Sequence, residues 1–116
     1  MQGRNFQGTG TGGSGSASNT NRVESVTDDA SPYYASAQDG LIIFKTTAAA
    51  RLYLPENTPP GKSIFIKCMG NVSTSSPVTI YPQGSGVTID GDSFFVLSFS
   101  YSAVQLVSTG SGWVIL

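Results

Sequence analysis

The middle of the chain alternates apolar and polar residues with the two-residue period of a β-strand. In residues 78–81, Val78 and Ile80 fall on one face and the residues between them on the other. The same alternation returns in residues 87–89, after a corner rich in Gly, and Asp90-Gly91 then supplies a tight turn, since glycine accepts a positive φ. This stretch predicts a strand, a corner, a strand and a turn, with no helical period.

Similar short runs occur along the rest of the chain, with Gly, Pro, Asp or Asn between them about every ten residues. Residues 47–50 hold the only row of helix-forming residues, and without a cap they are expected to form a loop. Many short, evenly spaced strands are typical of an all-β sandwich or barrel. We therefore predict a small antiparallel, jelly-roll-like β-sandwich over residues 22–116, with further strands in segments 23–27, 33–37, 41–46, 50–54, 64–68, 93–98, 104–108 and 113–116.

Residues 1–21 differ from the rest, because Gly, Ser, Thr and Asn dominate them and no strand pattern is present. Phe6 is their only aromatic residue and Arg4 their only charged side chain. Such a composition buries too little apolar surface to offset the entropy lost on ordering. We predict an extended N-terminal arm that is dispensable for folding of the sandwich.

Several predicted strands carry large apolar side chains on both faces, whereas a lone sandwich needs only one buried face per sheet. The second face is either a subunit interface or the ordinary scatter of exposed hydrophobic residues. Charged residues make up only 11% of the chain and the net charge is -1, so the surface is weakly protected against association. We therefore expect a homo-oligomer, with contacts through Phe65, Tyr81 and Phe94.

Composition argues against several classes of function. The Lys and Arg residues are scattered and form no patch for phosphates, which disfavours nucleic acid as a partner. No apolar segment is long enough to span a bilayer, and the first residues lack the hydrophobic core of a signal peptide, so no membrane partner is expected. Histidine is absent, which removes the commonest general base and metal ligand. We expect no enzymatic activity, no cofactor and no metal.

The remaining motifs are weak. Residues 8–13, GTGTGG, match a dinucleotide-binding fingerprint but follow no strand, and Gly61-Lys62-Ser63 lacks the earlier glycine of a phosphate-binding loop. Asp28-Asp29 and the Asp90/Asp92 pair fall in predicted turns, where Asp is favoured by local hydrogen bonds. Calcium binding and glycoside hydrolysis are the alternatives for such pairs. Cys68 alternates with apolar residues and is expected to be buried.

From about Gln38 to the end, the order of five segments is distinctive. They are LYLP at 52–55, GKSIFIK at 61–67, VTIYPQGSGVTIDG at 78–91, a serine- and aromatic-rich strand, and VQLVSTGSGWVIL at 104–116. In this order and spacing the chain resembles a recurrent β-sandwich module of tailed-phage structural proteins, found in head decoration proteins, head fibres and tail-fibre segments. The resemblance covers about two thirds of the chain.

The resemblance implies a trimeric, non-enzymatic structural protein. An arm followed by one domain suits a capsid decoration or head-fibre protein, which is assembled in the host cytoplasm and located on the capsid surface of the virion. Its partner would be the major capsid protein, with Arg4, Asn5 and Phe6 as anchoring residues. The alternative is a receptor- or glycan-binding module of a tail fibre or spike, although the sequence itself offers no support for a host-surface glycan.

Overall fold

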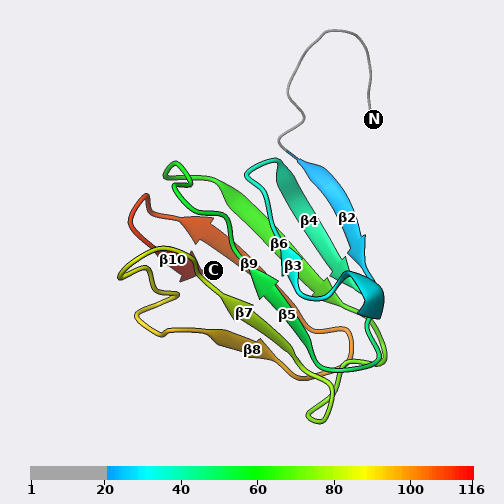
Figure 1. Ribbon diagram of the computed structural model, residues 1–116. Helices are drawn as coiled ribbons and strands as arrows, with labels where there is room; N and C mark the ends of the chain where they lie inside the picture. The colour runs from blue at the N-terminus through cyan, green and yellow to red at the C-terminus, as the bar shows by residue number, and fades with distance from the viewer. Residues whose placement is uncertain (1–20) are drawn as a thin grey trace, which may run out of the picture.

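The computed structural model describes residues 21–116, which form two β-sheets that face each other (Figure 1). The five-stranded sheet has the order β10-β9-β6-β4-β2, and its strands are Trp113–Ile115, Ala103–Ser108, Ser63–Cys68, Asp39–Phe44 and Arg22–Val26. The four-stranded sheet has the order β3-β5-β7-β8, with strands Tyr33–Tyr34, Ala50–Tyr53, Val78–Tyr81 and Phe95–Leu97. A single 3-10 turn, η1 (Asp28–Ala30), is the only helical element among these residues, so none of them forms a helix that could cross a membrane.

From β2 to β7 the chain alternates between the two sheets. Each strand therefore pairs with the strand two places away in the sequence, and the pairs β2–β4, β4–β6, β3–β5 and β5–β7 are all parallel. The chain forms a flattened coil, in which every turn contributes one strand to each sheet (Figure 1). The last strands close one end of this coil with the antiparallel pairs β7–β8, β6–β9 and β9–β10.

The prediction of an all-β fold is confirmed, but the prediction of antiparallel sheets is wrong for four of the seven strand pairs. Parallel neighbours need a long crossover connection, and here the crossover is the intervening strand of the opposite sheet. The sequence shows each strand by its alternation but not the sheet to which it belongs. The jelly-roll-like connection order and the trimer remain predictions.

The segment 87–89 is not the strand that its alternation predicts. Only Ile89 forms isolated bridges, to Asp92 and to Trp113. Ile89 and Asp92 exchange two backbone hydrogen bonds of 2.8 Å, and the residues between them have φ values of 49° and 86°. The predicted Asp90-Gly91 turn is thus confirmed, and the buried Ile89 side chain packs into the core from a loop.

The inward positions of both sheets form one apolar core between them. Phe44, Leu52, Ile66, Ile80 and Leu106 come from different strands and are completely buried, as strand alternation requires. Cys68 is likewise buried, as predicted, and burial raises the pKa of its thiol. On the last strand, β10, the Trp113 side chain is buried in this core and Ile115 packs against it.

Truncation of Phe44 tests this assignment of the core. Phe44 is completely buried at the end of β4, so Phe44→Ala should lower the free energy of unfolding by about 3–5 kcal/mol through lost contacts and a cavity. Phe99 is 72% exposed, so Phe99→Ala should change the free energy of unfolding by less than about 0.5 kcal/mol. Urea denaturation of the two variants measures both values, and equal effects would contradict the assignment.

Candidate interaction surfaces

The outward face of the five-stranded sheet is apolar. Strand register places Val23, Leu41, Phe65 and Gln105 side by side across four strands, and opposite residues of paired strands share a face. Ile43 lies beside them on β4. We call this surface the apolar face and define it by its large side chains, which are Val23, Leu41, Ile43, Phe65 and Leu116.

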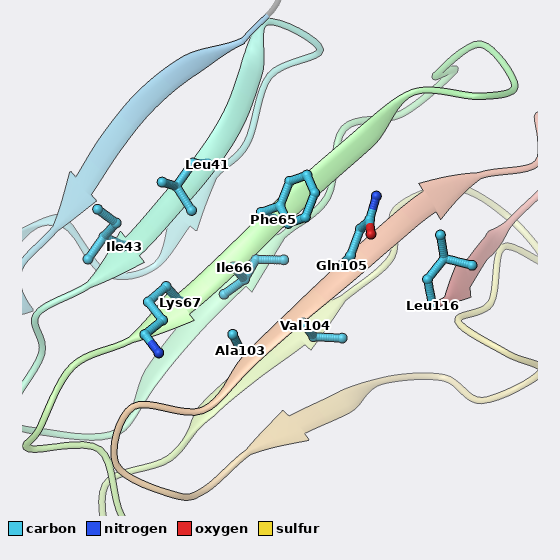
Figure 2. Close-up of a pocket in the computed structure, with 9 residues that line it drawn as sticks. All are labelled: Leu41, Ile43, Phe65, Ile66, Lys67, Ala103, Val104, Gln105 and Leu116. Carbon is cyan, nitrogen blue, oxygen red and sulfur yellow. The ribbon is translucent and has the colours of Figure 1, made fainter.

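A groove of about 480 Å³ runs across the apolar face between β4, β6 and β9 (Figure 2). The residues that line it are Leu41, Ile43, Phe65, Ile66, Lys67, Ala103, Val104, Gln105 and Leu116. Lys67 and Gln105 are the only polar side chains among them, and none carries a carboxylate.

Both polar side chains of the groove already have partners within the chain. Lys67 Nζ donates a hydrogen bond of 2.6 Å to the carbonyl oxygen of Tyr101 and lies 5.8 Å from the centre of its ring. Gln105 Nε2 donates to Ser63 Oγ at 3.2 Å. Each of these two side chains thus has one hydrogen bond within the chain, and a partner that covers the groove must leave the Lys67 ammonium in water or supply a group that pairs with it.

The outward face of the four-stranded sheet carries a row of stacked aromatic rings. Tyr34, Tyr53 and Tyr81 stand in register on β3, β5 and β7. Their ring centres are 4.9 Å apart for the first pair and 5.2 Å for the second, with interplanar angles of 12° and 20°. Phe94 continues the series, 6.0 Å from Tyr81. We call these four residues the aromatic row; because its rings cover one another, their broad faces are free only at its two ends.

The structure separates the predicted trimer contacts. Tyr81 and Phe94 are neighbours in the aromatic row, whereas Phe65 lies on the apolar face of the other sheet. A single flat contact cannot bury all three, because the core lies between them. The predicted anchoring residues Arg4, Asn5 and Phe6 fall outside the described residues.

A buried carboxylate ties β2 to the start of β4. Asp39 is fully buried, and its Oδ1 lies 2.9 Å from both Nε and Nη2 of Arg22. Its Oδ2 accepts hydrogen bonds from the hydroxyl of Tyr33 at 2.9 Å and from the backbone N–H of Ser36 at 3.0 Å. Asp39 lies between two predicted strands, where the sequence indicated only a turn. The sequence did not predict the cluster, because Arg22 and Tyr33, which bind the carboxylate, come from other strands.

The cluster shifts the pKa values of its members. Burial, followed by the hydrogen bond to Asp39, raises the pKa of Tyr33 to about 12. The hydrogen bond and charge of the same carboxylate raise the pKa of Arg22. The guanidinium Nε of Arg22 also lies 2.9 Å from Glu24. These contacts hold the first strand in the fold and leave no free carboxylate oxygen for chemistry at Asp39.

The other aspartates that the sequence singled out serve as turn residues where the structure shows their contacts. Asp28 accepts hydrogen bonds from Thr47 and from the backbone N–H of Ala48, and these bonds lower its pKa. Asp90 Oδ1 accepts a hydrogen bond of 3.1 Å from the backbone N–H of Ile115. No group of three or more His, Cys, Asp or Glu residues gathers in the part of the chain that the structure describes. Gly61-Lys62-Ser63 leads into strand β6 and not into a helix, so no helix N-terminus faces a phosphate there.

No protein-family model matches the chain, and no curated protein matches its sequence. The expected resemblance to phage structural modules therefore stays a prediction from the five sequence segments and their order.

Titration of Tyr33 tests the Asp39 cluster. An unfolded tyrosine loses its proton near pH 10, whereas folded Tyr33 holds it until about pH 12. The stability that this proton contributes is present below about pH 10 and is lost as the pH rises towards 12. We expect Tyr33→Phe to remove a late-titrating component from the phenolate absorbance of the native protein. Unchanged late titration in the variant would assign the shift to another tyrosine.

Proposed function

We propose that this chain is a non-enzymatic structural protein of a virus particle, of the capsid decoration or head-fibre type. It assembles with copies of itself through the apolar face and binds the major capsid protein through residues 1–21. The observation that carries the proposal is the apolar face itself, which no described part of the chain covers.

The physical argument for self-association is the cost of leaving this surface in water. Burial of apolar surface contributes about 25 cal/mol per Å², and contiguous apolar patches on soluble proteins commonly mark interaction sites. The few charges of the chain do little to oppose association. An apolar sheet face from another copy would cover the aliphatic and aromatic side chains of the groove, provided that the Lys67 ammonium stays at the edge of the contact, in water.

A trimer is the form that the phage resemblance implies. In such an assembly the five-stranded sheets would face a common axis, and the aromatic row would lie on the outside. Attachment to the shell then falls to residues 1–21, which precede β2 at the edge of the five-stranded sheet. Three arms on one trimer would bind together more tightly than one arm alone, because the second and third contacts become intramolecular.

The receptor-binding alternative has less support from the structure. A cluster of exposed Tyr, Trp and Asp at a loop tip would favour it. Trp113 instead lies in the core, and three of the tyrosines stack against one another on a sheet.

Two matched phenylalanines test which sheet forms the subunit interface. Phe65 on the apolar face is 47% exposed and Phe94 on the aromatic row is 49% exposed, so a charge at either should perturb the fold similarly. Phe65→Glu should convert the oligomer to a monomer, because a carboxylate in place of the ring would lose its hydration at the contact. Phe94→Glu should leave the trimer intact.

Sedimentation velocity at micromolar concentration distinguishes these outcomes. Circular dichroism of each variant shows whether the sandwich has folded. A wild-type protein that sediments as a monomer contradicts self-association, and dissociation by Phe94→Glu alone would move the interface to the four-stranded sheet.

Deletion of residues 2–20 tests attachment to the shell. The deletion ends before Arg22, so that the contact with Asp39 is kept. The truncated protein should fold and assemble but should no longer co-sediment with undecorated capsids, whereas the full chain should bind them. If the truncated protein decorates capsids as well as the full chain, attachment lies in the sandwich.

A further inference from the structure

Each sheet has two edge strands, which are β2 and β10 in the five-stranded sheet and β3 and β8 in the four-stranded sheet. At one end of the coil the loop residue Ile89 forms a bridge to Trp113 of β10, and at the other end β2 and β3 are the edges. On β3, the backbone N–H of Ala35 donates to the carbonyl oxygen of Tyr53 at 2.8 Å. Because backbone groups alternate in direction along a strand, the N–H and C=O of Tyr34 point away from β5, towards the open edge.

The aromatic row ends at the same edge. Among the described residues, Tyr53 alone stacks its ring on Tyr34. The Tyr34 side chain is 61% exposed, while Tyr53 and Tyr81 inside the row are half-buried. A free ring face and a free pair of backbone hydrogen-bonding groups therefore lie together at the edge of the four-stranded sheet.

The alternation of the strands between the two sheets indicates which kind of segment could pair with the free edge of β3. Strands from β2 to β7 go to the two sheets in turn, and all the pairs they form are parallel. A strand that precedes β2 in this alternation would belong to the four-stranded sheet, beside β3 and parallel to it. An aromatic side chain in register on that strand would stack on Tyr34, as Tyr34 stacks on Tyr53.

We propose that the open edge of β3 and the ring of Tyr34 bind an extended segment of this same chain centred on Phe6, which adds a fifth ring to the aromatic row. Phe6 is the only aromatic residue before Arg22. Tyr81 follows Tyr53 by 28 residues, and Tyr34 follows Phe6 by the same number, so the length of chain suits one more turn of the coil. Residues 7–20 can span up to roughly 50 Å when extended, which exceeds the longest dimension of the domain, 43 Å.

This contact gives Phe6 a role within the domain, in place of the capsid contact that the sequence predicted for it, and leaves the rest of the arm to meet the shell. It does not depend on the proposed function, because it concerns the protein alone. Phe6 in contact with the capsid, and free of Tyr34, is the competing outcome.

The experiment uses the full chain in solution without capsids. Nuclear magnetic resonance should show cross-relaxation between the ring protons of Phe6 and Tyr34. Amide hydrogen exchange at Tyr34 should become at least about tenfold faster in Phe6→Ala, because the strand that protects its N–H no longer binds. Phe99→Ala, which removes an exposed ring elsewhere, should leave this rate unchanged.

Equal exchange at Tyr34 in the wild type and in Phe6→Ala, without ring contact, would overturn the proposal. A mixture of differently labelled chains separates contact within one chain from contact between copies, and a signal between copies alone would also overturn it. Capsid binding by the same Phe6→Ala variant is measured separately, so that the proposed function can fail or stand independently of this contact.

Discussion

The structure depends on the alternation of the chain between two sheets that share one core. Neither sheet can form from a continuous piece of sequence, because a strand of the opposite sheet interrupts every parallel pair. Ile42 and Phe44 of one sheet and Leu52 and Ile80 of the other belong to the same buried cluster. The hydrogen bonds of the sheets and the burial of the core are therefore formed together, which makes the fold a single cooperative unit.

The same alternation builds the outward surfaces. Parallel in-register pairing brings residues that are 18 to 28 positions apart in the sequence next to one another, as for Val23, Leu41 and Phe65 on one side. On the other side it brings Tyr34, Tyr53 and Tyr81 together. Similar side chains at equivalent points of successive turns thus become a continuous apolar face and a continuous stack of rings.

The sequence predicted local structure well, because local structure depends on alternation and turn chemistry. Most of the strands lie within a few residues of their predicted positions, and the Asp90-Gly91 turn and the burial of Cys68 are confirmed. The exception, residues 87–89, alternates like a strand but pairs only through the isolated bridges of Ile89. It lies between two turns, at Gly84 and Gly86 and at Asp90-Gly91, where the backbone has positive φ.

The sequence did not predict which of the two sheets each strand belongs to. Phe65, Tyr81 and Phe94 all stood out as large outward side chains, yet alternation alone cannot show that the first lies on a different face from the other two. The aromatic row could have been suspected from the sequence, because Tyr34, Tyr53 and Tyr81 each stand at the end of a short strand. The Asp39 cluster had no such local signal, since its partners Arg22 and Tyr33 come from two other strands.

The two outward faces differ in how much of their apolar surface is stabilised by contacts within a single chain. In the aromatic row Tyr34, Tyr53 and Tyr81 stack on one another. Each stacked pair contributes about 0.5–1.5 kcal/mol beyond simple burial, so part of this face is stabilised within one chain. The large side chains of the apolar face are aliphatic apart from Phe65, so they cannot form a comparable stack of rings. Their exposed surface can be stabilised only by something that covers it. This difference between the two faces, more than the total apolar content of the chain, is the reason for proposing association through the five-stranded sheet.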